Sequence, residues 1–332
     1  MELLTSRFTR RDFLRWSGTV AAVLLGGLAS ERGHALISAS AELARVNWGM
    51  WLPQWQWGGG VQDSVLLNAE TSLGHRISPV HWFAADTESW DYDDVMTTSL
   101  LSLGRVPLIT WEFWHSGLGS IAAGAVDDVP ETGLRAWARG MKAHAPSEIL
   151  LRIFHEFNDP NRSQGSGYPW SVASGTENSP SDLVAAWRHV VSVFRAEGAG
   201  NVRFCWCPDG TFSGTSMHPG SSSPPLSAAY PGDEWVDYVG WDDYGYDTGA
   251  LYSAMQQVAP GKQIILAEVQ SFDIGWIKGL SQLANDGNHG NLHSVVWFDE
   301  GRQYLAESPS VRAAVKEMLQ TPAFQTSSAG EA

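Results

Sequence analysis

Cysteine is scarce in this chain. Its 332 residues include two, Cys205 and Cys207, in the stretch RFCWCPDG. On a strand these two residues share one face, and their Cα atoms lie about 6.5–7 Å apart, which disfavours a disulfide. Two cysteines are also too few for a structural zinc site. We expect two buried free thiols. No cluster of His, Cys and Asp has metal-ligand spacing, so we expect neither a metal nor another cofactor.

Positive charge is also in short supply. Lys and Arg number 21 against 36 Asp and Glu, which gives a formal net charge of −15 at pH 7. Such a surface repels a phosphate backbone, so it excludes nucleic acid as a partner and favours a neutral or cationic one. The glycine-rich phosphate fingerprint of doubly wound folds is missing too. The stretch WGGGVQD follows an aromatic-rich loop and is a weak match.

The sequence has no apolar run that spans a bilayer comfortably. The run VAAVLLGGLA follows the paired arginines of TRRDFLRWSG and precedes ISASA, with small residues at Ala39 and Ala41. This order is typical of a twin-arginine signal peptide. We expect residues 1–41 to direct export by the Tat route to the medium, periplasm or cell envelope, with no membrane contact after cleavage. An uncleaved anchor is the alternative.

Short apolar runs alternate with helical patterns along the rest of the chain, and no linker divides it. Eight runs are largely continuous, as expected for parallel strands covered on both faces. A helix or helix-like turn follows each run, which predicts an α/β fold, the (β/α)8 TIM barrel. We expect a monomer with one catalytic domain over residues 42–322 and a disordered C-terminal tail over 323–332. The predicted strands are residues 45–52, 76–84, 105–113, 148–157, 201–208, 236–244, 262–270 and 292–300.

Tryptophan, in contrast, is abundant, with 17 residues. Many lie beside polar residues at the predicted strand ends, which read WLPQW, HWFAAD, TWEFWH, FHEFND, CPDG, WDDYGY, AEVQS and WFDE. Catalytic groups of a TIM barrel collect at the carboxyl ends of its strands, and Trp stacks on the flat faces of pyranose rings. Core packing explains about half of the tryptophans. The others predict a sugar-binding cleft.

Two acids, Glu156 and Glu268, follow the fourth and seventh strands, which lie nearly opposite in an eight-stranded barrel. Strand alternation puts Arg152 and Phe154 on the same face as Glu156, and Leu266 on the same face as Glu268. The two carboxylates can therefore face each other. Retaining glycoside hydrolysis needs such a pair about 5–5.5 Å apart, one protonated and one ionised. A structural ion pair is the alternative for either acid alone.

Seven stretches of the chain resemble glycoside hydrolase family 26, and they cover most of residues 76–300 in the family's order. The resemblance implies a retaining (β/α)8 hydrolase with its acid/base after the fourth strand and its nucleophile after the seventh. The elements HE-x-N and YPG…VD..G.D.Y are fairly specific together. The matching stretches are VPLITWEFW, LLRIFHEFN, YPW, AAWRHVVSVFRAEGAGNVRFCW, YPGDEWVDYVGWDDY, KQIILAEV and VVWFD.

The resemblance also implies roles for single residues. Glu156 is the acid/base and Glu268 the nucleophile. His155 hydrogen-bonds substrate or the acid/base, and a small bulge lets both point inward. Asp242 and Tyr244 match the family's Asp-x-Tyr, whose tyrosine contacts the nucleophile. The other expected substrate contacts are Trp111, Asn158, Trp170, Trp206 and Trp297, the last matching the tryptophan under the sugar at the cleavage point.

Arg152 is expected beneath Glu156, either as a partner of that acid or in a buried ion pair within the barrel. The chain departs from the family pattern after the His-Glu pair, where Phe157 replaces Met, Asp159 replaces Gly, and PNRSQGSG precedes YPW. These departures leave the two glutamates in place and put the substrate preference in doubt.

The sequence as a whole predicts an exported retaining endo-β-glycosidase that acts on a neutral plant or microbial polysaccharide. β-1,4-Mannan is the first choice by family frequency. Mixed-linkage β-glucan, β-1,3-xylan and the cell's own exopolysaccharide are alternatives. A non-catalytic sugar-binding barrel is the rival from another class, and retention of both glutamates and Tyr244 favours the enzyme.

Overall fold

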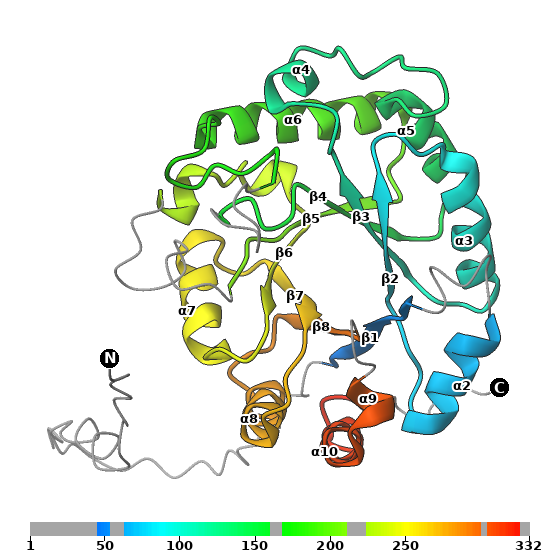
Figure 1. Ribbon diagram of the computed structural model, residues 1–332, viewed down its shortest axis with the longest axis vertical. Coiled ribbons are helices and arrows are strands. Elements are labelled where there is room, and N and C mark those ends of the chain that lie inside the picture. Colours follow the sequence, from blue (N-terminus) through cyan, green and yellow to red (C-terminus); the bar gives the residue numbers. More distant parts are fainter. Residues whose placement is uncertain (1–44, 54–62, 160–167, 211–223, 300–303, 326–332) are drawn as a thin grey trace, which may run out of the picture. The chain divides into compact units, whose positions relative to one another are not determined.

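The computed structural model describes residues 45–53, 63–159, 168–210, 224–299 and 304–325 (Figure 1). The predicted signal segment, residues 1–41, lies outside these ranges. Within them, no helix combines the length and the apolar character that a membrane crossing needs.

Eight parallel strands close into one barrel in sequence order (Figure 1). Most of their side chains are buried, as expected for strands covered on the outside by helices and packed on the inside by one another. The structure therefore confirms the (β/α)8 TIM barrel. The strands are β1 (Asn47–Trp51), β2 (Val80–Ala85), β3 (Pro107–Glu112), β4 (Ile149–Ile153), β5 (Val202–Trp206), β6 (Tyr238–Asp243), β7 (Gln263–Val269) and β8 (Leu292–Phe298).

Helices surround this ring of strands (Figure 1). The longest, α6, starts at a capping box of Ser179 and Asp182 with Pro180 in its first turn, and it ends at Gly198 with φ 81°. The helices are α2 (Asp63–Leu73), α3 (Trp90–Ser102), α4 (Leu118–Ala122), α5 (Leu134–Ala143), α6 (Pro180–Glu197), α7 (Thr248–Val258), α8 (Ile274–Asn285), α9 (Tyr304–Glu307) and α10 (Pro309–Leu319), with 3-10 turns η2 (Leu226–Ala228) and η3 (Asp233–Trp235).

The apolar core has two layers. The larger layer lies between the strands and the helices and holds most of the buried tryptophans. The smaller layer fills the barrel interior. Both thiols belong to it and are free, as expected. Its buried residues are Leu108, Leu150, Cys205, Cys207, Ile265, Ala267 and Val296.

Strand β4 stops at Ile153, four residues before its predicted end at residue 157. The cause is left-handed backbone at Phe154 (φ 49°) and Glu156 (φ 50°), a conformation that costs a non-glycine residue about 1–3 kcal/mol and that clusters at functional sites. Phe154 therefore turns outward and packs against Phe113 and α6. The prediction that Phe154 shares a face with Arg152 is wrong.

Strand β7 is also irregular, because its register against β8 shifts just after Leu266. Leu266 packs in the outer layer and Ala267 in the inner one. The bulge then lets the next residue, Glu268, point inward as well, to Arg152. The prediction that Leu266 and Glu268 share one face is therefore wrong.

The folded chain continues past the predicted boundary at residue 322. Ala323 and Phe324 are buried, and the Phe324 ring packs edge-on against Trp48 of β1. The predicted disordered tail thus starts too early, since its first two residues belong to the core. Residues 326–332 lie outside the described ranges.

Candidate active site

Three carboxylates meet at the carboxyl ends of β4, β6 and β7. One oxygen from each of Glu156, Asp242 and Glu268 lies within 4.8 Å of the others, and all three side chains are buried. Glu156 comes from the left-handed turn after β4, Asp242 from β6, and Glu268 from the irregular part of β7. The structure therefore brings the acids that follow the fourth and seventh strands together.

The guanidinium of Arg152 lies among these carboxylates. Its Nη1 donates to both oxygens of Asp242 at 2.7 and 2.8 Å, and its Nη2 donates to Glu268. Its Nε donates to the Thr110 hydroxyl at 2.7 Å, and that hydroxyl lies 2.7 Å from Nε2 of His81. Burial lowers the pKa of His81 well below its usual value, so the ring is neutral. Arg152 is thus in a buried ion pair with Asp242 and Glu268.

The surroundings of Glu156 favour its protonated form. Burial, followed by the negative charges of Asp242, Asp209 and Glu268, raises the pKa of Glu156 well above its usual value. The Tyr168 hydroxyl donates to Glu156 Oε2 at 2.9 Å and opposes this rise. A carboxyl group that keeps its proton near neutral pH can deliver that proton to a leaving group.

Both carboxyl oxygens of Glu268 accept hydrogen bonds. Arg152 donates to Oε1, and the Tyr244 hydroxyl donates to Oε2 at 2.5 Å. Burial and the nearby carboxylates raise the pKa of Tyr244 well above its usual value, so the phenol keeps its proton and remains a donor. Hydrogen bonds to both oxygens stabilise a carboxylate, the form that can act as a nucleophile.

Glu156, Asp242 and Glu268 are, among the described residues, the acids close enough to hold a metal ion together. Burial raises the pKa of Asp242, and Arg152 opposes that rise. Because both oxygens of Asp242 accept from Arg152, it is best treated as a carboxylate. The guanidinium already supplies a cation to two of the three acids and would repel a divalent ion at short range. The donor set therefore fits a metal poorly.

His155 lies in an aromatic group beside Glu156. The Tyr168 hydroxyl is 3.1 Å from Nε2 of His155, so this phenol joins His155 to Glu156. The Tyr168 ring stacks on Trp170 at 4.6 Å, and the Trp170 indole donates to the His155 carbonyl at 2.6 Å. Trp170 is buried, and its predicted contact with substrate stays a prediction. Tyr168 was not singled out from the sequence, although it opens the matching YPW stretch.

Asn158 joins two strand ends. Its Nδ2 donates to the Asp209 carbonyl at 2.9 Å, and its Oδ1 accepts from the Asp209 N–H at 2.7 Å. The side chain is buried and its amide is engaged on both sides. Asn158 thus ties the turn after β4 to the segment after β5, and its predicted contact with substrate stays a prediction.

Three more tryptophans expected at the substrate are fully buried on the outer side of the strands. Trp111 stacks against α5 at a ring distance of 4.2 Å. Trp206 packs edge-on against Tyr230, and Trp297 packs against Trp48. Their predicted contact with substrate is therefore wrong, because their rings pack toward the helices and away from the carboxylates.

The inward aromatic residue of β8 is Phe298 in place of Trp297. Phe298 stacks on Trp51 at 4.5 Å and packs edge-on against Phe83 and Tyr244. These four rings, from β1, β2, β8 and the residue after β6, form an aromatic wall beside Glu268. Sequence reasoning missed Trp51, Phe83 and Phe298, although each lies in a strand end that it singled out as aromatic.

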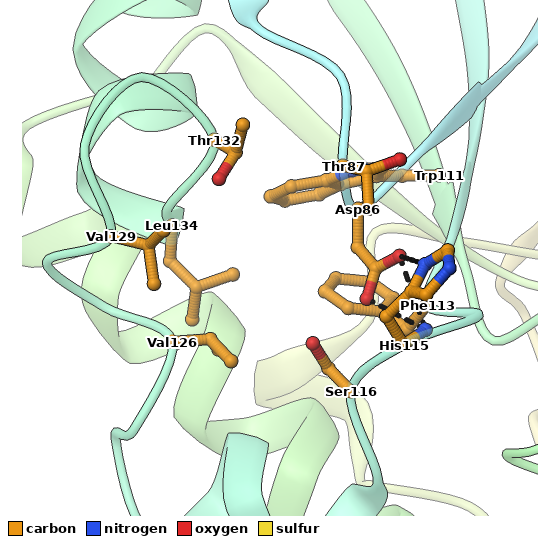
Figure 2. Close-up of a pocket in the computed structure, with 10 residues that line it drawn as sticks. All are labelled: Asp86, Thr87, Trp111, Phe113, His115, Ser116, Val126, Val129, Thr132 and Leu134. Carbon is orange, nitrogen blue, oxygen red and sulfur yellow. Dashed lines mark hydrogen bonds and ion pairs between the residues drawn. The ribbon is translucent and has the colours of Figure 1, made fainter.

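Trp111 lines a separate cavity of about 300 Å³, which lies between the loops after β2 and β3 and the segment before α5 (Figure 2). Figure 2 shows Trp111 and Phe113 facing Val126, Val129 and Leu134 across it. None of the three carboxylates lines this cavity, so it is not part of the site.

Comparison of the sequence with models of known protein families finds a match. The model of the family described as glycosyl hydrolase family 26 matches residues 133–285, the stretch that carries all three carboxylates. Over this stretch the chain matches glycoside hydrolase family 26. The expected family resemblance is thereby confirmed.

Two curated relatives of the chain have names that state an activity. Endoglucanase H of Acetivibrio thermocellus is 28% identical over 301 residues, which cover 83% of this chain and 31% of that protein. Mannan endo-1,4-beta-mannosidase of Bifidobacterium adolescentis is 28% identical over 167 residues, 48% of this chain and 15% of that protein. The chain therefore spans about a third or less of the length of these relatives.

Solved structures of family 26 proteins share the fold. A beta-mannanase from Bacteroides ovatus matches with a TM-score of 0.58 at 15% identity, over 85% of this chain and 90% of that one. A family 26 protein from Muricauda matches with a TM-score of 0.60 at 18% identity, over 85% and 87%. At such identities these matches show the fold alone.

Proposed function

We propose that this chain is a retaining endo-β-glycosidase, with Glu156 as acid/base and Glu268 as nucleophile. The carrying observation is that an oxygen of Glu156 and one of Glu268 lie within 4.8 Å. Retaining glycosidases hold their two carboxyl groups about 5–5.5 Å apart, whereas inverting enzymes need about 6.5–9.5 Å to fit a water between them. The short separation supports direct attack by a carboxylate.

In the first step, Glu268 attacks the anomeric carbon while Glu156 gives its proton to the glycosidic oxygen. The glycosidic bond breaks, the leaving chain departs as an alcohol, and a glycosyl ester forms on Glu268. The hydrogen bonds from Arg152 and Tyr244 hold the nucleophile in one orientation before it attacks.

In the second step, Glu156 is a carboxylate and takes a proton from water. That water attacks the anomeric carbon, the ester bond breaks, and Glu268 is released with the sugar configuration retained. The Tyr168 hydroxyl stabilises the carboxylate form of Glu156 at this stage, because it donates a hydrogen bond to Oε2.

β-1,4-Mannan is our first substrate, supported by the relative named mannan endo-1,4-beta-mannosidase. Mixed-linkage β-glucan is the second candidate, because the relative named endoglucanase H matches over the larger part of this chain. A non-catalytic sugar-binding barrel is less well supported, since binding alone does not need one protonated and one ionised glutamate. We also propose that the protein is a monomer exported by the Tat route.

The test incubates the protein with β-1,4-mannan, lichenan and β-1,3-xylan and measures new reducing ends. Glu268→Ala should lower the rate at least about 10³-fold, because it removes the nucleophile and several kcal/mol of barrier lowering. Glu156→Ala should lose most activity on polysaccharide as well. NMR of the first product released should show the β-anomer.

Glu317→Gln is the matched control, since Glu317 is an exposed glutamate on α10. Full activity of the Glu268→Ala variant would contradict the assignment of Glu268 as the nucleophile. Retained sugar binding by a wild-type protein that cleaves none of the three polymers would favour the non-catalytic barrel.

A further inference from the structure

A groove of about 430 Å³ lies between α7 and α8 on the outer wall of the barrel. Figure 1 shows these two helices, in yellow and orange, next to each other outside the strands. None of the three carboxylates lines this space, which we call the α7–α8 groove. The lining residues that matter here are Tyr246, Asp247, Trp276, Gln282, Asp286 and His289.

The groove begins near the strand ends that carry the active site. Tyr246 follows Tyr244 by two residues, and Trp276 lies in the first turn of α8, shortly after Glu268. The Trp276 indole donates to the Tyr246 carbonyl at 2.7 Å, which ties the loop after β6 to the start of α8. Tyr246 and Trp276 thus follow closely after the strands that carry Asp242 and Glu268.

The aromatic rings of the groove suit a sugar. The Tyr246 side chain is 39% exposed, and the Trp276 ring is half-buried. Amphipathic aromatic rings offer a flat apolar face together with a polar group, and such faces stack on pyranose rings. The hydrogen bond of Trp276 also fixes the orientation of its ring, so less conformational entropy is lost when a ligand binds.

The polar groups of the groove select a neutral ligand with many hydroxyls. Asp286 accepts from Nδ1 of His289 at 2.8 Å, and the His289 ring packs edge-on against Tyr252, so these side chains are held in place. Gln282 adds an amide that can both donate and accept. Two carboxylates, Asp247 and Asp286, in a chain of net charge −15 disfavour an anionic ligand.

We propose that the α7–α8 groove is a second sugar-binding site, which holds a neutral polysaccharide at a distance from the bond that is cleaved. The choice of polymer rests on the proposed function, whereas binding itself needs no catalysis. A polymer held at both places has a raised effective concentration at the carboxylates. Polymers therefore gain from the groove, and oligosaccharides too short to reach it do not.

The test measures binding of β-1,4-mannan, lichenan and β-1,3-xylan to the full chain by affinity electrophoresis. A Glu268→Ala parent keeps each polymer intact during the measurement. Adding Trp276→Ala should weaken binding of the preferred polymer about tenfold, equivalent to about 1.4 kcal/mol. Tyr246→Ala should weaken it as well, and this change leaves intact the backbone carbonyl that Trp276 contacts. Tyr92→Ala on α3 is the control, since that tyrosine is 46% exposed.

The proposal is overturned if the parent binds none of the three polymers, if both groove variants bind as the parent does, or if Tyr92→Ala weakens binding equally. Weaker binding in both groove variants supports the second sugar-binding site. If the wild type also cleaves nothing, only the proposed glycosidase function is contradicted. If the wild type cleaves a polymer and both groove variants bind as tightly as the parent, the proposed function is supported and the proposed second binding site is contradicted.

Discussion

At the scale of residues, the site places two glutamates in opposite surroundings. Burial and neighbouring carboxylates keep the proton on Glu156, whereas Arg152 and Tyr244 donate to both oxygens of Glu268. Acid and nucleophile in a retaining glycosidase must differ in this way although the side chains are identical. Their difference comes from the surrounding strands.

Tyr168→Phe should move the basic limb of the kcat/KM profile to higher pH. Glu156 is active as an acid only while protonated, so activity falls as pH rises through its raised pKa. The Tyr168 hydrogen bond lowers that pKa, so its loss should move the limb to higher pH. Polysaccharide hydrolysis measured across the pH range checks this, with Tyr92→Phe as control. A limb that stays or moves down contradicts the expectation.

At the scale of elements, the sequence predicts all eight strands because each is a nearly continuous apolar run. That same continuity hides which residues point inward, since a strand covered on both faces shows no polar alternation. In VVWF of β8 both Trp297 and Phe298 are plausible inward residues, and packing selects Phe298. The left-handed turn after β4 and the bulge in β7 have no clear sequence signal either, although each directs one of the two facing glutamates inward.

Helix α3 carries a buried acid whose removal should change the pH dependence of stability. Burial raises the pKa of Asp93 to about 7, and the Trp82 indole donates to its Oδ1 at 2.7 Å. The folded state therefore holds a proton that the unfolded chain releases at lower pH. The contribution of Asp93 to stability is therefore fully present below the unfolded pKa, and it is lost as pH rises from there through the folded pKa of about 7.

Asp93→Asn should remove most of this fall, which amounts to about 2–3 kcal/mol between pH 5 and pH 8. Urea unfolding at both pH values measures it, and Asp91→Asn, at an exposed position on the same helix, is the control. An equal fall in Asp93→Asn and wild type would show that Asp93 is not responsible.

At the scale of the whole molecule, the barrel closes where β1 pairs with β8, and the end of the described chain covers this seam. The Phe324 ring is 2% exposed and packs on Trp48. Phe324→Ala should lower the free energy of unfolding by about 3 kcal/mol, because it leaves a cavity beside β1. Denaturant unfolding measures the loss, and Gln325→Ala, at the exposed neighbouring position, should change stability little. Equal stabilities would place Phe324 outside the core.

The sharing of Arg152 between Asp242 and Glu268 has a consequence for the charge of the barrel interior. At the start of the proposed reaction, the two carboxylates, the guanidinium and the protonated Glu156 sum to one negative charge. In the glycosyl ester Glu268 is neutral, but Glu156 has become a carboxylate, so the sum is again one negative charge. Both half-reactions therefore move charge over a few ångströms without changing its total, and the buried interior needs no ion to enter or leave during a turnover.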